Sequence, residues 1–497
     1  MRRLTNIILI MTLGNITAYT QLSGYNLMEY QLGNIPEVRP KDLSTLYEQL
    51  NLKYRYKSVR LLLRTEQFFS TDSAKRDYQT LSQYQVRYTG KKFEFKAGNF
   101  YETLGRGLLL RSYEIPGSIT EDRIFRRRQA FYRDVLGFMG KYSTGNFMIK
   151  VLRGKTLNNS VPPGLENRRL DLVEAIESHY KILKQTAGVM IMRYTDPVQQ
   201  KVYSGGLVEG NLPLNISYYG EYVQAVGDDN PLLNFTSSSS YGAYLSLNHS
   251  YKNYGISIEL KDYHNLFLGY GFTDPPLLVK EQPYPLLNRS THVSNLVDEQ
   301  GYQVELYYHF QKENMITLNT SMAVNNLFRK YVFMEYFAEY YQPFVKGNIM
   351  KLFADYAEDN LILNEKRFTG GFNTHVILPG YWTLSFEQET QYINRTDSAQ
   401  KNPVNLYNGI NLSKSTRFSA GLIFEYTTDP LFADKPGTRR TEKNRSYLGG
   451  SLSYRPDYNN TLSIFIGQRR GGLACTSGIC YEVLDFSGVE IRWNVKF

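Results

Sequence analysis

A charge-dense stretch between Gly98 and Arg128 holds the residues whose chemistry is easiest to define. Gly98, Gly105 and Gly107 interrupt a strand-like pattern there, and isolated glycines in strands mark bulges or close backbone approach. The stretch is either a solvated loop or a segment folded inward, where facing acidic and basic groups would narrow a passage and select solutes by charge. No phosphate-binding loop is indicated, because the helix that such a glycine motif opens is absent. The charged candidates are Glu102, Arg106, Arg111, Glu114, Arg123, Arg126, Arg127 and Arg128.

Catalysis has one candidate pair, His292 and Ser294 in STHVSN. This segment resembles the H-x-S-N segment of outer-membrane phospholipase, whose Ser-His-Asn arrangement performs acyl transfer. A nucleophilic serine needs a base within hydrogen-bond reach and a third group that orients the base, and two-residue spacing alone supplies neither. The segment also lies in a proline-rich loop region of a much longer chain. A loop held by local hydrogen bonds is therefore favoured, no catalytic residue is assigned, and a hydrolase is the remote alternative.

The first residues are typical of a secretory signal peptide. Arg2 and Arg3 precede an apolar stretch from Ile7 to Leu13, and the small residue Ala18 follows. A buried N-terminal helix or strand is the alternative. We expect residues 1–18 to be removed and residues 19–497 to form the mature protein. No other apolar run approaches the roughly 20 residues that a membrane helix needs, so membrane insertion would require a barrel.

Cys475 and Cys480 are the only two cysteines. Close pairing in an exported chain is typical of a local disulfide, whereas a metal site would need further ligands and the loop offers no histidine. The sequence predicts a disulfide at a loop tip, no metal site and no cofactor.

Alternation of apolar and polar residues recurs along the chain. It is clear in GYQVELYYHFQ and in the final VEIRWNVKF, and it accompanies a composition rich in tyrosine (42), phenylalanine (27) and glycine (38) with a mean hydropathy of −0.41. Period-two alternation indicates strands with one apolar face. A soluble antiparallel sheet and a membrane barrel both produce it.

The lengths of the connections separate these two possibilities. Counting back from Phe497, RRGGLACTSGICYEVLD is long, RPDYNN is short, and long and short gaps continue to alternate. Transmembrane barrels have short periplasmic turns and longer extracellular loops. The predicted fold is all-β, a single transmembrane antiparallel β-barrel of about 22 to 24 strands. Including Leu22 to Gly33 as the first strand gives the even count of about 24, with the disulfide loop at the cell surface and Phe497 in the periplasm.

The chain also resembles Gram-negative outer-membrane proteins, whose terminal aromatic residue is read by the barrel-assembly machinery. Trp493 and Phe497 stand in the strand that would carry this assembly signal. More narrowly, GNFYETLGRGLLLRSYE and GGLACTSGICYEV are similar to an uncharacterised family of large outer-membrane β-barrels. The resemblance implies location in the cell outer membrane, with membrane lipid, lipopolysaccharide and the assembly machinery as partners.

Three classes of function are compatible with such a barrel. A porin-like channel or translocation pore is favoured, because a barrel this wide cannot be filled by its own strand side chains. The alternative is an accessory or scaffold subunit bound to other envelope proteins, and an enzyme comes last. Removal of two arginines with the signal peptide would leave 55 basic against 47 acidic residues, which favours anionic solutes or lipopolysaccharide phosphates. The scattered charges do not indicate nucleic-acid binding.

Overall fold

The computed structural model describes most of the chain from residue 22 to the C-terminus. Residues 1–21, which include the predicted signal peptide, lie outside the described residues. The described ranges are 22–72, 77–156, 162–226, 240–266, 275–276, 278–293, 298–310, 313–326, 330–344, 347–362, 365–396, 402–430, 444–476 and 479–497.

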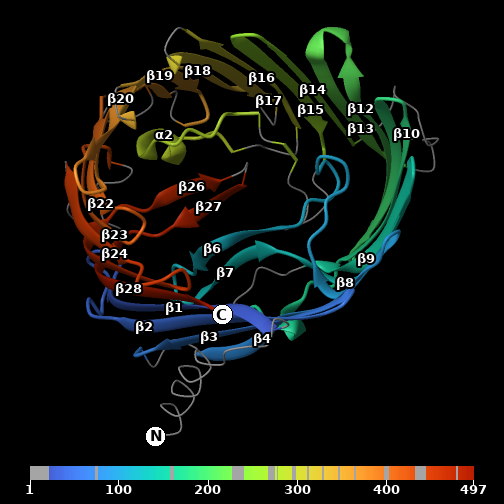
Figure 1. The fold of residues 1–497 in the computed structure, drawn as a ribbon, viewed down its shortest axis with the longest axis horizontal. Coiled ribbons are helices and arrows are strands. Elements are labelled where there is room, and N and C mark those ends of the chain that lie inside the picture. Colours follow the sequence, from blue (N-terminus) through green and yellow to red (C-terminus); the bar gives the residue numbers. More distant parts are fainter. Residues whose placement is uncertain are drawn as a thin grey trace, which may run out of the picture.

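Twenty-four antiparallel strands form a closed barrel, shown end-on in Figure 1. Closure occurs where β1 pairs on one side with β2 and on the other with the last strand, β28. The barrel and its first strand are thus confirmed. Its strands are β1 Leu22–Asn34, β2 Ser44–Tyr56, β3 Val59–Ser70, β4 Tyr78–Thr89, β5 Phe93–Phe100, β8 Val135–Thr144, β9 Phe147–Thr156, β10 Leu172–Ile182, β11 Gln185–Thr195, β12 Gln200–Leu212, β13 Ile216–Val226, β14 Tyr241–Tyr251, β15 Tyr254–His264, β16 Asp298–His309, β17 Met315–Asn325, β18 Tyr331–Pro343, β19 Ile349–Asp359, β20 Glu365–Leu378, β21 Trp382–Arg395, β22 Val404–Lys414, β23 Phe418–Thr427, β24 Arg445–Tyr454, β25 Asn460–Arg469 and β28 Phe486–Lys496.

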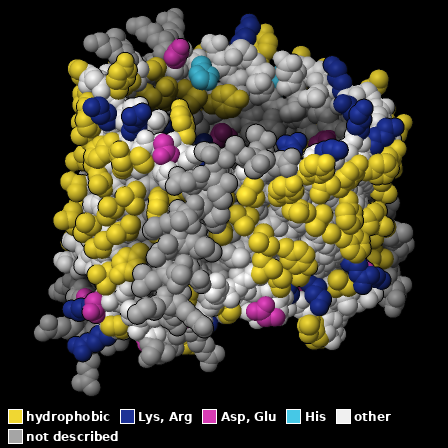
Figure 2. All heavy atoms as spheres, turned by 60° about the horizontal axis from the view of Figure 1, so that its bottom comes forward, with side chains coloured by type: hydrophobic (Ala, Val, Ile, Leu, Met, Phe, Trp, Pro, Cys, Tyr) yellow, Lys and Arg dark blue, Asp and Glu magenta, His cyan; other side chains and the backbone are white. Residues whose placement is uncertain are grey.

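Alternation along the strands separates an apolar outer face from an inner face that is polar on many strands and carries an apolar cluster on β8 to β15. On β3, Leu61 and Leu63 are each 41% exposed on the outside, whereas Arg64 and Glu66 are buried on the inside. Hydrophobic side chains cover much of the outer wall in Figure 2, and Lys and Arg side chains gather toward its upper and lower edges. Within the described residues, no helix has the length and apolar character needed to cross a membrane.

The connections differ in length between the two ends of the barrel. At one end, called the short-turn end, only a few residues join successive strands. The first barrel strand begins and the last one ends there, and the backbones of Gly24 and Phe497 exchange hydrogen bonds of 2.7 and 3.0 Å. The turn from β2 to β3 and the turn from β14 to β15 each leave two residues between strands. Three of the long connections follow β5, β15 and β25, and all lie at the opposite, long-loop end.

Those three connections carry segments that lie inside the ring of strands (Figure 1). The charged segment, residues 101–134, contains a hairpin of β6 (Tyr113–Glu121) and β7 (Arg128–Arg133). The helical segment, residues 278–293, contains α2 (Pro285–Arg289). The disulfide hairpin, residues 470–485, contains β26 (Gly472–Thr476) and β27 (Ile479–Val483). Short 3-10 turns at Leu165–Asn167 and Pro213–Asn215 also occur within the described ranges.

Candidate functional site

Four leucines anchor the base of the charged segment. Leu104, Leu108, Leu109 and Leu110 are each 0% exposed, and burying one leucine contributes about 1.5 to 3 kcal/mol relative to leaving it in water. They join the largest buried apolar cluster of the described residues, which also draws on inward side chains of the wall from β8 to β15. The residues of the wall in this cluster include Val135, Met139, Leu152, Val173, Met192, Tyr203, Leu207, Val223, Tyr244 and Tyr263.

Backbone contacts with two wall carboxylates fix the same region. Gly105 N–H donates to Glu177 Oε1 at 2.9 Å, and Arg106 N–H donates to Glu221 Oε2 at 2.7 Å. Gly105 has a φ of +52°, and a Cβ there would lie 2.4 Å from the Glu221 carboxylate. The Arg106 guanidinium covers the ring of Tyr219 at 4.6 Å. Only glycine fits this approach of backbone to wall.

Two arginines attach the far end of the hairpin to the first barrel strand. Arg128 Nη1 lies 2.6 Å from Glu29 Oε1 of β1, and Arg128 Nη2 lies 3.3 Å from Glu121. Arg126 pairs with Glu121 and donates to the side chain of Asn34. Burial alone would lower the pKa of Arg128, but Glu121 and Glu29 raise it above its ordinary value, so the guanidinium stays charged. Both arginines thus hold the hairpin to the wall.

The other predicted charged residues are distributed rather than gathered. Glu102 lies 2.5 Å from Lys96 of β5 and 3.5 Å from Lys150 of β9, and Glu114 lies 2.5 Å from Arg64 of β3. At the hairpin tip, Arg127 lies 3.5 Å from Asp122, and Arg123 pairs with Glu482 of the disulfide hairpin. Arg111 forms an isolated backbone bridge with Thr103. Glu102, Glu114, Arg106, Arg126 and Arg128 thus bond with strands of the wall, whereas Arg111, Arg123 and Arg127 contact the inward segments.

The helical segment docks on the wall from β18 to β23. Tyr284 stacks on Phe353 at 3.7 Å between ring centres and donates to Glu339. Burial raises the pKa of the Tyr284 phenol, so it remains a donor. Arg289 forms a two-point ion pair with Glu425 at 2.5 and 3.0 Å. Burial would lower the pKa of Arg289, but Glu425 raises it, so this attachment is charged as well.

His292 contacts a carboxylate and an aromatic ring. Its Nε2 lies 3.2 Å from Glu299 Oε2, and the same carboxylate accepts from Lys261 Nζ. The imidazole stacks on Phe333 with 5.0 Å between ring centres. Ser294 and Asn295 lie outside the described residues. No group of three or more His, Cys, Asp or Glu in the described residues is arranged to hold a metal ion.

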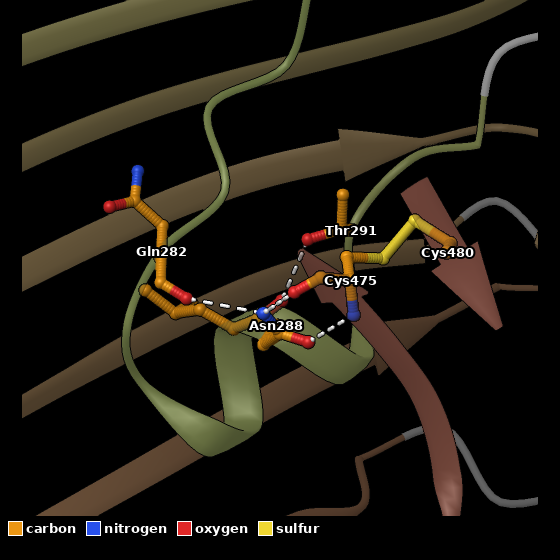
Figure 3. The surroundings of a disulfide bond; sticks show 6 residues. Gln282, Asn288, Thr291, Cys475 and Cys480 are labelled. Carbon is orange, nitrogen blue, oxygen red and sulfur yellow. Dashed lines mark hydrogen bonds between the residues drawn. A yellow bond between two sulfur atoms is a disulfide. The ribbon is translucent and has the colours of Figure 1, made fainter. Parts of the chain in front are cut away.

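The disulfide hairpin joins the other two segments. Cys475 and Cys480 are bonded, as predicted. The Cys475 backbone exchanges hydrogen bonds of 2.9 and 3.1 Å with the side chain of Asn288 of α2 (Figure 3). The ring of Tyr481 contacts that of Phe131 of β7, with 4.9 Å between ring centres. Arg123 and Glu482 form an ion pair between the same two segments. The disulfide bond lies at the last pairs of the β26–β27 hairpin, and contacts with α2 and β7 place this hairpin inside the ring of strands at the long-loop end (Figure 1). The location of that end at the cell surface stays a prediction.

The terminal strand carries charge inward and apolar groups outward, as its alternation predicts. Glu490 lies 2.6 Å from Arg469, and Arg492 donates to Glu29, the carboxylate that also holds Arg128. Ile491, between them, is 36% exposed on the outer face. Trp493 and Phe497 share that outer face by parity, and their role as an assembly signal stays a prediction.

The wall partners are what sequence reasoning missed. Glu29, Glu177 and Glu221 occupy inward positions in strands whose residues alternate between the two faces, so the sequence indicates which way their side chains point. It contains no signal for their bonding partners, which lie 99, 72 and 115 residues away along the chain.

Comparisons with known proteins agree with this architecture. Residues 32–115 match a family of unknown function, DUF6029, which supports the resemblance to an uncharacterised family. No curated protein has a significantly matching sequence. An Escherichia coli P pilus tip assembly intermediate, PapC-PapD-PapK-PapG, has a TM-score of 0.53 at 11% identity, covering 97% of this chain and 62% of that chain.

Two further solved structures are similar at lower scores. The P pilus usher (PapC) translocation pore has a TM-score of 0.46 at 10% identity, with coverage of 96% of this chain and 99% of that chain. OccK5 (OpdH) of Pseudomonas aeruginosa has a TM-score of 0.40 at 10% identity, with coverage of 75% and 97%. At such identities, the likeness to the pilus assembly intermediate establishes the barrel fold and nothing finer.

Proposed function

We propose that the protein is an outer-membrane channel whose lumen is narrowed by the charged segment, the helical segment and the disulfide hairpin. The observation that carries this proposal is the mutual contact of the three segments inside a closed barrel. A barrel of 24 strands has an interior far wider than its wall side chains can fill, so the inward segments determine what passes. Buried ion pairs attach the charged segment and the helical segment to the wall, and hydrogen bonds with Asn288 join the disulfide hairpin to α2. These attachments favour a fixed constriction over a loosely moving one.

The proposal includes export and orientation. Residues 1–18 are removed as a signal peptide, the barrel-assembly machinery recognises the strand ending in Phe497, and residues 19–497 insert among outer-membrane lipid and lipopolysaccharide. The short-turn end, with both barrel termini, faces the periplasm. An accessory role in a larger envelope complex is the competing proposal, because interlocked segments would also suit a closed scaffold.

Single-channel recording in planar bilayers tests the channel proposal. We expect the mature protein to conduct, and deletion of residues 119–128 to raise its conductance, because the deletion removes the tip of the hairpin together with Arg126 and Arg128. Deletion of residues 431–440 from a different long-loop connection is the control of equal length. Its conductance should match that of the parent protein.

Two outcomes would contradict the proposal. If neither the parent nor the 119–128 deletion conducts although both are folded, the scaffold role is favoured. If the control deletion raises conductance as much as the 119–128 deletion, the charged segment is not the constriction.

A further inference from the structure

Four cations stand side by side on the inner wall near the short-turn end. In the strand register, Arg55 of β2 faces Arg60 of β3, Arg60 faces Arg87 of β4, and Arg87 faces Lys96 of β5. We call these four residues the cation ladder. Their inward direction follows from Lys96, which contacts Glu102 of the charged segment, and from Arg64, which shares its face with Arg60 and contacts Glu114.

Such a ladder is unfavourable unless something compensates its charge. Like charges directly opposite on neighbouring strands destabilise a sheet. Glu94 lies 2.7 Å from Arg87 and 3.6 Å from Lys96, and Glu102 takes a further bond from Lys96. Among the described residues, no ion pair joins Arg55 or Arg60, or Lys53 of the same inner face, to an acidic group. The wall of β2 to β5 therefore keeps an excess of positive charge.

A cavity of about 590 Å³ lies beside the end of the ladder formed by Arg87 and Lys96, and its lining combines hydrogen-bond donors with Glu114 and apolar side chains. Lys53, Arg87 and Lys96 line it together with Asn51, Arg64 and Gln83. Three donor atoms of this lining are buried without a hydrogen-bond partner: Asn51 Nδ2, Arg64 Nη1 and Arg87 Nε. Buried polar groups of proteins are normally paired, so three unpaired donors at one cavity indicate a missing acceptor.

Across the barrel, two acidic residues of the inner face have cationic partners. Glu305 of β16 pairs with Lys280 of the helical segment, and Glu339 of β18 lies 3.6 Å from Lys351 of β19. β16 and β18 lie across the barrel from β2 and β3 in Figure 1. Within the described residues, these lysines are thus paired with acids, unlike Arg55 and Arg60 of the ladder.

We propose that the cation ladder and its cavity bind a small organic polyanion, a solute with two or more carboxylate or phosphate groups, on its way through the lumen. Arginine guanidinium groups bond both kinds of oxyanion at two points, and the amide of Asn51 supplies a neutral donor beside them. The inference deepens the proposed function and rests on it in one respect: the bound polyanion is a transported solute only if the protein is a channel. It also moves anion recognition from Arg126 and Arg128, which acids already hold, to the wall of β2 to β5.

Binding to the folded mature protein in detergent micelles tests the site without any need for conduction. Isothermal titration with citrate and with pyrophosphate covers the two chemistries, and we expect at least one to bind. Replacement of two ladder residues, Arg60→Gln with Arg87→Gln, should weaken binding at least tenfold. Lys181→Gln with Lys252→Gln removes the same charge from the short-turn end near β10 and β14, and should leave binding unchanged.

The outcomes separate the site from the channel. The inference is overturned if neither probe binds the parent protein, or if the ladder and control variants bind alike. Binding by a protein that does not conduct would support the site and contradict the channel. The gel shift between heated and unheated samples reports whether each variant is folded. If the double variant fails to fold, the single variant Arg55→Gln, at the exposed end of the ladder, takes its place. Unchanged binding by that single variant would then overturn the inference.

Discussion

Arg128 shows how one side chain can connect two parts of this molecule. It is 3% exposed and bonds two carboxylates, one on β1 and one on the neighbouring hairpin strand. A buried guanidinium of this kind costs desolvation, which its partners offset only while both are present. Its contribution is therefore specificity of attachment more than net stability.

Arg128→Gln should destabilise the folded protein by about 3 kcal/mol, because removing one partner of a buried ion pair leaves uncompensated charge. Urea unfolding followed by tryptophan fluorescence measures the change. Arg153→Gln is the matched control, because Arg153 also pairs with a carboxylate, that of Glu174, but its side chain is 54% exposed. Exposed ion pairs contribute at most about 1 kcal/mol to the free energy of unfolding. Equal losses in the two variants would contradict the buried attachment.

Ile491→Arg tests the outward direction of the last strand. Because Ile491 lies on the apolar outer face, arginine there should cost about 2 to 4 kcal/mol if the position is near the membrane midplane. Folding yield into lipid vesicles measures this cost, and Ile491→Val should fold like the parent. Normal insertion of the arginine variant would argue against a lipid-facing wall.

At the scale of the element, the charged segment depends on a backbone conformation that one residue supplies. The positive φ of Gly105 brings two backbone amides to Glu177 and Glu221 while the adjoining leucines enter the apolar cluster. The segment thus combines an apolar anchor at its base with an ionic anchor at its tip.

Gly105→Ala should loosen the base of this segment, because the added Cβ would meet the Glu221 carboxylate at a position that already requires left-handed backbone. We expect a larger and noisier single-channel conductance. Gly117→Ala offers a comparison with φ of +78° but no atom within 4 Å of the added carbon. A conductance increase confined to Gly117→Ala would contradict the proposed anchor.

The sequence predicts strands well here and contacts between segments poorly. Period-two alternation and turn length are local properties, so the first strand, the inward charges of β28 and the disulfide can all be predicted. The leucines at 108–110 break that alternation and indicate only a segment that is not a strand. Their burial depends on a wall formed by β8 to β15, and the place of the disulfide hairpin depends on Asn288, 187 residues away along the chain.

At the scale of the whole molecule, the barrel is a single closed sheet whose first and last strands are neighbours. Removal of residues 22–34 should therefore prevent closure, since β28 and β2 would both lose a partner along their full length. Heat-modifiable mobility on gels, which distinguishes folded barrels from unfolded chains, would measure this. A stable folded species lacking β1 would contradict the 24-stranded closure.

Glu29 has a consequence for the order in which the protein can form. This carboxylate bonds Arg492, 463 residues away along the chain, and also Arg128 of the inward hairpin. Contacts between such distant residues form late, because the intervening chain must first be ordered. Until the last strand arrives, β1 has an unpaired edge and the hairpin has an incomplete binding site. A nascent barrel therefore needs another surface to shield that edge, and its constriction matures only when its final residues are in place.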